Sequence, residues 1–98
     1  MIALEQKFAP EIMTELAQRV RSRRKERGLN QQQFAARAGM SFGSYKRFEQ
    51  CGEISLRSLI GIALALGCEN EFDDLFAKQG YSSIEEVIND VRWPDRFP

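Results

Sequence analysis

Residues 31–50, QQQFAARAGMSFGSYKRFEQ, constrain the fold more than any other stretch of the chain. Gly39 separates two short segments with helical spacing, and glycine readily adopts the left-handed conformation that a sharp corner demands. Ser41 follows as a candidate N-cap for the second segment. The stretch therefore predicts two short helices, over about residues 31–38 and 42–50, that meet at a tight turn. Their apolar residues are Phe34, Ala35 and Ala38 in the first and Tyr45 and Phe48 in the second.

The apolar pair of the second predicted helix leaves its opposite face free to point outward. Because Ala35 is small, the two helices can cross closely. This is the layout of a helix-turn-helix, a motif whose second helix enters the DNA major groove. The residues of the outward face are Phe42, Gly43, Ser44, Lys46 and Arg47.

A longer stretch, residues 28–66, resembles the helix-turn-helix family of Cro and the phage repressors, the XRE family. The resemblance rests on GLNQQQFAARAG, on residues 41–49 and on the segment SLRSLIGIALALG. It implies an all-α fold: a five-helix lambda-repressor-like DNA-binding domain, here with an added short C-terminal helix and tail. It also implies sequence-specific binding of double-stranded DNA.

Around the motif the chain divides into three parts. We expect an N-terminal arm over residues 1–10 and the DNA-binding domain over residues 11–79, with residues 31–50 at its centre. We expect residues 80–98 to form a C-terminal helix and tail that contacts a second subunit or a partner.

Three further helices are expected in the domain. The first runs over about residues 10–27, and a fifth is capped by Asn70 and turns Phe72, Leu75 and Phe76 inward. The helix over residues 56–66 is apolar around most of its circumference and should be the central buried helix. Its apolar residues include Leu56, Leu59, Ile60, Ala63, Leu64 and Leu66.

The net charge of zero conceals a strong asymmetry along the chain. Residues 1–50 hold ten Lys and Arg and five Asp and Glu, whereas residues 51–98 hold four and nine. Within residues 19–47 there are nine basic residues and one acidic residue. A concentrated basic stretch attracts phosphate, so this half of the chain is suited to nucleic acid.

The residue content argues against an enzyme or a metal protein. The chain has no histidine and two cysteines, which excludes the usual zinc finger and the usual catalytic pairs. We expect no cofactor. The longest apolar run is too short to span a bilayer, and no signal peptide opens the sequence, so we expect a cytoplasmic protein without a membrane contact.

Phosphate contacts are expected at the starts of the two motif helices. Gln31 would offer an amide and backbone N–H groups to one phosphate, the role that this glutamine usually has in the family. Ser41 is placed for a second phosphate, and Arg37 adds long-range attraction.

Base contacts are expected from the outward face. Lys46 and Arg47 can each donate to guanine O6 and N7, and Ser44 can reach a base or a phosphate. Relatives commonly place polar side chains at positions 42 and 43. Phe42 would instead contact a thymine methyl group or extend the core beside Tyr45, and Gly43 permits close backbone approach.

One charged pair is expected inside the domain. The apolar residues Ile12, Leu16 and Val20 are spaced by fours, and the next position in the series is Arg24. Glu49 likewise adjoins the inward face of the second motif helix. Because a lone buried charge is costly, we expect Arg24 and Glu49 to form a structural ion pair, as the corresponding residues do in relatives. The alternative is that both extend into solvent.

Several segments resemble a narrower group, the HipB-like antitoxins. They are KRFE, GEISLRSLI, ALG, FDDLF and a following S-x-x-E helix. Such proteins repress their own operon and bind a HipA-type kinase toxin encoded beside them. The resemblance implies a homodimeric repressor on a palindromic operator. The alternatives are a free-standing XRE regulator, or an interaction module that no longer binds DNA.

The C-terminal part carries apolar residues beyond the needs of a five-helix core. We expect them to form the dimer interface and a docking site for a partner such as a HipA-like kinase toxin, because aromatic residues are favoured as interface anchors. The alternative is that this segment folds back onto its own domain. The residues are Ile84, Val87, Ile88, Val91, Trp93 and Phe97.

Overall fold

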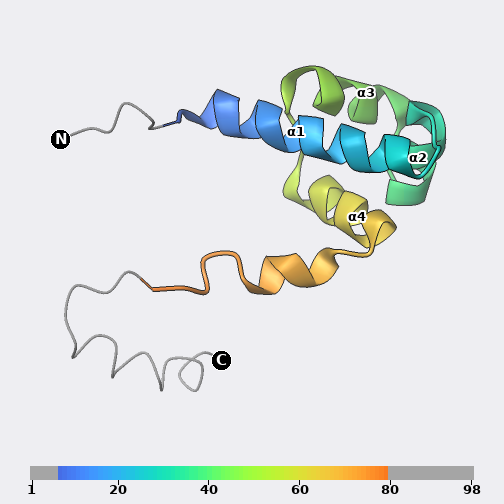
Figure 1. The fold of residues 1–98 in the computed structure, drawn as a ribbon. Helices are drawn as coiled ribbons and strands as arrows, with labels where there is room; N and C mark the ends of the chain where they lie inside the picture. The colour runs from blue at the N-terminus through green and yellow to red at the C-terminus, as the bar shows by residue number, and fades with distance from the viewer. Residues whose placement is uncertain (1–6, 80–98) are drawn as a thin grey trace.

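The computed structural model describes residues 7–79, which contain four α-helices and no strand. The helices are α1 (Ala9–Glu26), α2 (Gln31–Ala38), α3 (Phe42–Cys51) and α4 (Leu56–Leu66), and a 3₁₀ helix, η1 (Glu69–Asp73), follows. In Figure 1, α3 and α4 lie on opposite sides of the long α1, and α2 lies near its C-terminal end. None of the described helices is long and apolar enough to cross a membrane.

Polar side chains cap the starts of the three short helices. The Asn30 side chain accepts from the Gln33 N–H at 2.7 Å, and the Gln33 side chain accepts from the Asn30 N–H at 3.0 Å. Ser41 and Ser55 cap α3 and α4 by accepting from N–H groups three residues ahead, each at 3.1 Å. These bonds satisfy N–H groups that have no partner inside the helix, so each helix begins where its cap lies.

The core lies where the four helices meet. The Phe34 and Tyr45 rings pack edge to face with their centroids 5.2 Å apart, a favoured geometry for aromatic pairs. α1 contributes small residues to this centre. The largest fully buried side chains are Tyr45, Phe34, Phe48 and Ile62, and Ala17, Val20, Ala35 and Ala38 pack around them.

Ile12 was expected on the buried stripe of α1, but its side chain is exposed. The backbone of α1 approaches the end of α3 at Met13, which lies against Gly52. In Figure 1 the N-terminal end of α1 extends past α3 and α4, and Ile12 lies in this end of the helix, before Met13.

The expectation that α4 is the central buried helix holds for only one of its sides. Ile62 and Ala63 are buried, but Leu56, Ile60 and Leu64 are exposed. These three residues are spaced by four and therefore lie along one face of the helix. The other described helices pack against the opposite side of α4. A helix that is apolar around most of its circumference is therefore buried here on one side only.

The expected fifth α-helix is a 3₁₀ helix over Glu69–Asp73 followed by turns. Phe72 is half-buried, but Leu75 and Phe76, expected to face inward, are exposed. A short helix depends on burial of its apolar face, and here Phe72 and Leu75 border a cavity beside α1 and α4 without filling it. The predicted helix and tail over residues 80–98 lie outside the described residues.

The close approach of α4 to α2 depends on Gly61. A Cβ atom at this position would overlap the backbone carbonyl oxygen of Ala38. Gly43, in α3, has open space around the same position. The two glycines therefore form a matched pair, one at a helix crossing and one on a free surface.

We expect Gly61→Ala to lower the free energy of unfolding by about 1–3 kcal/mol, because backbone cannot move aside as a side chain can. Gly43→Ala should instead stabilise by up to about 1 kcal/mol, since alanine restricts the unfolded chain and favours helix. Urea unfolding followed by circular dichroism would measure both. Equal effects of the two substitutions would contradict this account of the α2–α4 crossing.

Candidate nucleic-acid interface

α2 and α3 meet at a corner centred on Gly39, whose φ of 74° lies in the left-handed region. The Met40 N–H donates to the Ala35 carbonyl at 2.9 Å, which satisfies a carbonyl at the end of α2. Ala35 is buried where the two helices pack. The corner and the small residue together set the direction of α3 relative to α2.

α3 divides into a buried face and an exposed face. Tyr45 and Phe48 are fully buried. Phe42, which the sequence left open between the core and the surface, is 42% exposed and lies outside the buried core cluster. The residues predicted to read DNA all lie on the exposed face: Phe42, Gly43, Ser44, Lys46 and Arg47.

The hydroxyl group of Ser41 is engaged at the start of α3. It accepts from the Ser44 N–H and donates to the Ser44 hydroxyl at 2.8 Å. The Ser41 side chain is therefore already hydrogen-bonded within the cap. The backbone N–H groups in the first turn of α3 remain as donors suited to a phosphate. Arg37 is exposed in the last turn of α2.

The two cationic side chains of α3 contact neighbours on the surface. The Lys46 ammonium lies 6.0 Å from the centroid of the Phe42 ring, at the outer limit of a cation–π contact. The Arg47 guanidinium donates to the carboxylate of Glu53, in the loop after α3. This hydrogen bond and the charge of Glu53 raise the pKa of Arg47.

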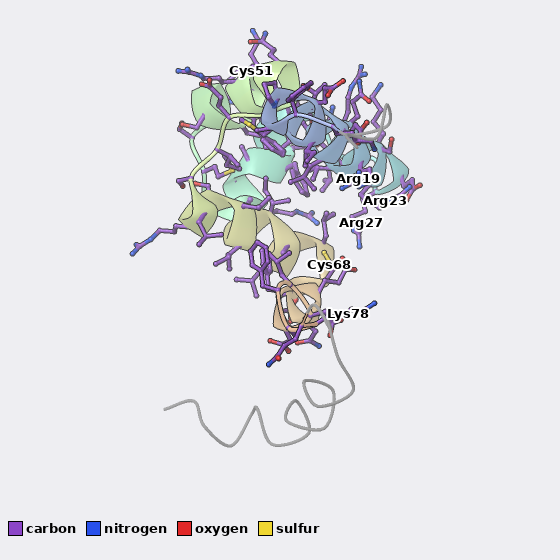
Figure 2. All side chains as sticks on the ribbon, turned by 90° about the vertical axis from the view of Figure 1, so that its left-hand side faces the viewer. Arg19, Arg23, Arg27, Cys51, Cys68 and Lys78 are labelled. Atoms are coloured by element: carbon purple, nitrogen blue, oxygen red, sulfur yellow. The ribbon has the colours of Figure 1, made fainter. Side chains whose placement is uncertain are left out.

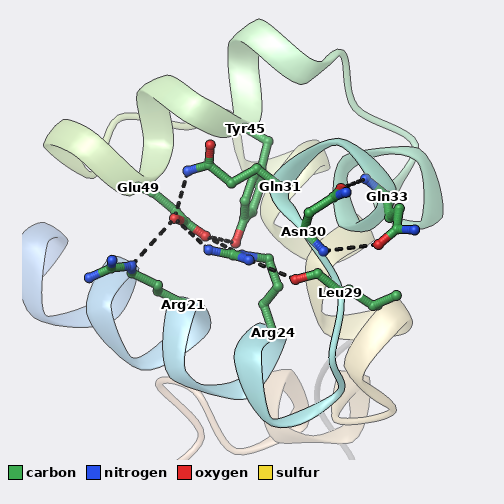
Figure 3. Close-up of polar contacts among 8 residues, drawn as sticks. All are labelled: Arg21, Arg24, Leu29, Asn30, Gln31, Gln33, Tyr45 and Glu49. Atoms are coloured by element: carbon green, nitrogen blue, oxygen red, sulfur yellow. Dashed lines mark hydrogen bonds and ion pairs between the residues drawn. The ribbon is translucent and has the colours of Figure 1, made fainter.

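Gln31, the first residue of α2, is held by Glu49 of α3. Its amide nitrogen donates to a Glu49 carboxylate oxygen at 2.8 Å (Figure 3). An amide nitrogen carries two hydrogens. The second hydrogen can therefore donate to a phosphate while the bond to Glu49 orients the side chain.

Glu49 is also the centre of a buried charged network (Figure 3). Arg24 donates to both carboxylate oxygens, from Nε at 2.8 Å and from Nη2 at 3.2 Å, and the Tyr45 hydroxyl donates to Oε2. Arg24 also donates to the Leu29 carbonyl at 2.7 Å. The side chains of Arg24 and Glu49 are only 8% and 4% exposed, so the pair is shielded from water.

The network determines the charge state of its members. Burial by itself raises the pKa of Glu49, but hydrogen bonds from Arg24, Tyr45 and Gln31 outweigh burial and hold the pKa below its usual value. Burial and the bond to Glu49 raise the pKa of Tyr45, which keeps the hydroxyl protonated as a donor. The carboxylate is thus ionised and the phenol neutral near pH 7.

Sequence reasoning missed four pairs at this interface: Tyr45–Glu49, Gln31–Glu49, Arg47–Glu53 and a looser ion pair of Arg21 Nε with Glu49 Oε1 at 3.9 Å. Tyr45 precedes Glu49 by four residues, a helical spacing that could have revealed their contact. The bonds from Gln31 to Glu49 and from Arg47 to Glu53 join different elements, so no periodic signal marked them. Among residues 7–79, no group of His, Cys, Asp or Glu could hold a metal ion.

We expect Glu49→Ala to destabilise the fold by about 3–5 kcal/mol, because it leaves the buried Arg24 guanidinium without its partner. Glu53→Ala should cost less than about 1 kcal/mol, since the Arg47–Glu53 pair is exposed. Chemical unfolding of both variants would measure the difference. Similar costs for the two would show that the buried network contributes little.

The network also predicts a pH dependence of stability. The folded state holds the pKa of Glu49 below that of the unfolded chain, so its stabilisation is complete above the ordinary glutamate pKa of about 4.3. This stabilisation is lost as the pH falls through the lowered pKa, because the Glu49 carboxylate is protonated at a higher pH in the unfolded chain than in the folded one. Glu49→Gln should flatten the pH dependence of the unfolding free energy below about pH 4.5, measured in urea.

Comparison with known proteins identifies the domain. The model of a helix-turn-helix family matches residues 20–69, which is half of the chain and includes α2, α3 and α4. No curated protein and no solved structure matches significantly. The matched family is a DNA-binding domain of transcription regulators and not an enzyme family. The chain therefore belongs to the XRE-type helix-turn-helix family.

Proposed function

We propose that this protein is a sequence-specific repressor of transcription that binds a palindromic operator as a homodimer. The observation that carries the proposal is the exposed face of α3, which presents Ser44, Lys46 and Arg47 from a helix whose other face is fully buried. A rigid helix with exposed donors can enter the major groove and read base edges.

Phosphate contacts supply most of the affinity and the orientation in this proposal. Gln31 donates its free amide hydrogen to one phosphate, while the bond to Glu49 keeps the side chain in place. The start of α3 at Ser41 offers backbone N–H groups to a second phosphate. Exposed Arg37 and the other basic residues of 19–47 add attraction that weakens as salt increases.

Base recognition is assigned to the outer face of α3. Arg47 donates to a guanine, which requires the guanidinium to leave or share Glu53. Lys46 and Ser44 add further donors, and exposed Phe42 contacts a thymine methyl group. Gly43 lets the backbone approach the bases. A dimer on a palindrome would hold its two α3 helices about 34 Å apart, one turn of B-DNA.

A more specific role is that of a HipB-like antitoxin. Its support is the sequence resemblance in KRFE, GEISLRSLI and FDDLF and in the segment after Gly80. In this role the protein represses its own operon and captures a HipA-type kinase. A kinase gene beside this one, and its co-purification with the protein, would test the role; a free-standing XRE regulator would have neither.

A second candidate function is a protein-interaction module that no longer binds DNA. The apolar Phe42 on the outer face and the pairing of Arg47 with Glu53 favour it. A mobility-shift assay on the protein's own upstream DNA, repeated across salt concentrations, separates the two. Binding that is specific and weakens with salt supports the repressor, whereas no binding at low salt supports the module.

We expect Arg47→Ala to weaken cognate binding by about 1–3 kcal/mol and to relax base preference at one position. Gln31→Ala should weaken binding to all sequences alike, by about 1 kcal/mol, because phosphate contacts carry no base information. Gln32→Ala is the control, since its side chain points away from Gln31 on α2. Unchanged affinity and preference in Arg47→Ala would mean that α3 is not the reader.

We also expect Glu53→Gln to raise DNA affinity by a few fold, about 1 kcal/mol or less, because it frees Arg47 and removes a negative charge. In an Arg47→Ala background the same change should have a smaller effect. Fluorescence anisotropy with labelled operator DNA would complete this double-mutant cycle. An equal gain in both backgrounds would attribute the effect to net charge alone.

A further inference from the structure

A partly open cavity of about 320 Å³ lies between α1, α4 and residues 68–75. Its lining is mainly apolar, and Cys68, Arg19 and Glu71 also border it. The apolar lining residues include Leu16, Val20, Ile62, Leu66 and Phe72.

The exposed stripe of α4 continues this apolar surface. Leu56, Ile60 and Leu64 are 65%, 38% and 58% exposed. Ala63 lines the cavity and lies seven residues after Leu56, so the two are nearly in line along the helix. Cavity and stripe together form one surface, here called the α4 apolar surface. An exposed patch of this kind marks a contact with another segment or molecule.

Three arginines of α1, here called the arginine row, lie near the same surface, and Arg23 among them is paired with Glu26 of its own helix. Arg19, Arg23 and Arg27 are spaced by four along α1, and Figure 2 shows them on the side that faces Cys68 and Lys78. Arg19 lines the cavity, and Arg27 donates to the Leu66 carbonyl at the end of α4 at 3.0 Å. An occupant with an apolar face and acidic flanks would suit this surface.

The chain itself contains such a segment. Nineteen residues follow Gln79, the last described residue, and among them Ile84, Val87, Ile88 and Val91 have the i, i+3, i+4, i+7 spacing of one helical face. The acidic residues between and beside them are Glu85, Glu86 and Asp90. The segment therefore pairs an apolar face with negative charge, which complements both the α4 apolar surface and the arginine row.

Length also favours the chain's own segment. The five chain steps from Gln79 to Ile84 span at most about 17 Å when extended, so the segment begins close to the last described residue. Residues 69–73 already contact α4. A short connection gives a tethered segment a high effective concentration, which favours it over a second molecule.

We propose that residues 82–91 cover the α4 apolar surface of their own chain, with Ile84, Val87, Ile88 and Val91 against it and acidic residues beside the arginine row. This assigns those four residues to the fold-back arrangement that the sequence left open, in place of a dimer contact. Trp93 and Phe97 come after this segment in the sequence and are not part of the proposed contact. The proposal is independent of DNA binding and is tested without DNA.

Cys68 in the cavity lining provides a direct test. In the full-length Cys51→Ser chain, Val87→Cys places a thiol on the apolar face, and Glu86→Cys, its control, places one on the acidic face. Mild oxidation with copper phenanthroline should join Val87→Cys to Cys68 within one chain. This disulfide should form about tenfold faster than with Glu86→Cys, because a disulfide needs Cβ atoms about 4 Å apart and only the apolar face would lie that close to Cys68. Mass spectrometry and non-reducing gels would measure both rates. Ile88→Cys repeats the test, and circular dichroism checks that each variant is folded.

Each outcome decides the proposal. A monomeric disulfide restricted to the apolar-face variants supports it. A disulfide of dimer mass would overturn it in favour of a second copy on the surface, and equal or absent cross-linking from both faces would overturn it outright. As an independent measurement, Ile88→Asp in the Cys51→Ser chain should speed maleimide labelling of Cys68 by about tenfold; an unchanged rate would also contradict the proposal.

Discussion

The carboxylate of Glu49 joins three helices, and the candidate interface depends on it. Arg24 of α1, Gln31 of α2 and Tyr45 of α3 all donate to its two oxygens. A buried charge is tolerated only when its hydrogen-bonding capacity is filled, so the three donors must be held together for the domain to fold. The same bonds that stabilise the core therefore also orient Gln31, the side chain predicted to contact phosphate.

This arrangement connects stability to DNA recognition. Tyr45 and Phe48 pack α3 against the aromatic core, and Glu49 bonds the C-terminal half of α3 to Arg24 of α1. Because these contacts fix the helix, its exposed face has a defined position. Arg47, by contrast, is held only by an exposed contact with Glu53. An exposed pair is weak, so the reading side chain can exchange its partner without disturbing the helix that carries it.

α4 illustrates where sequence reasoning succeeded and where it failed. Its limits were predicted correctly, because Ser55 caps its start and Gly67 ends it. Its burial was not, since an almost wholly apolar helix gives no indication of which side meets the rest of the domain. The segment after Gly67 was also predicted incorrectly, because an α-helix was expected there and a 3₁₀ helix forms.

The sequence by itself determined the starts of α2, α3 and α4, the corner at Gly39, the two faces of α3 and the family, because caps, glycine and apolar spacing are local properties of the chain. Only the tertiary structure decided that Gln31 meets Glu49, that Arg47 meets Glu53 and that one side of α4 remains exposed. These features depend on contacts between elements that are separated in the sequence. A local sequence pattern does not show which elements will meet.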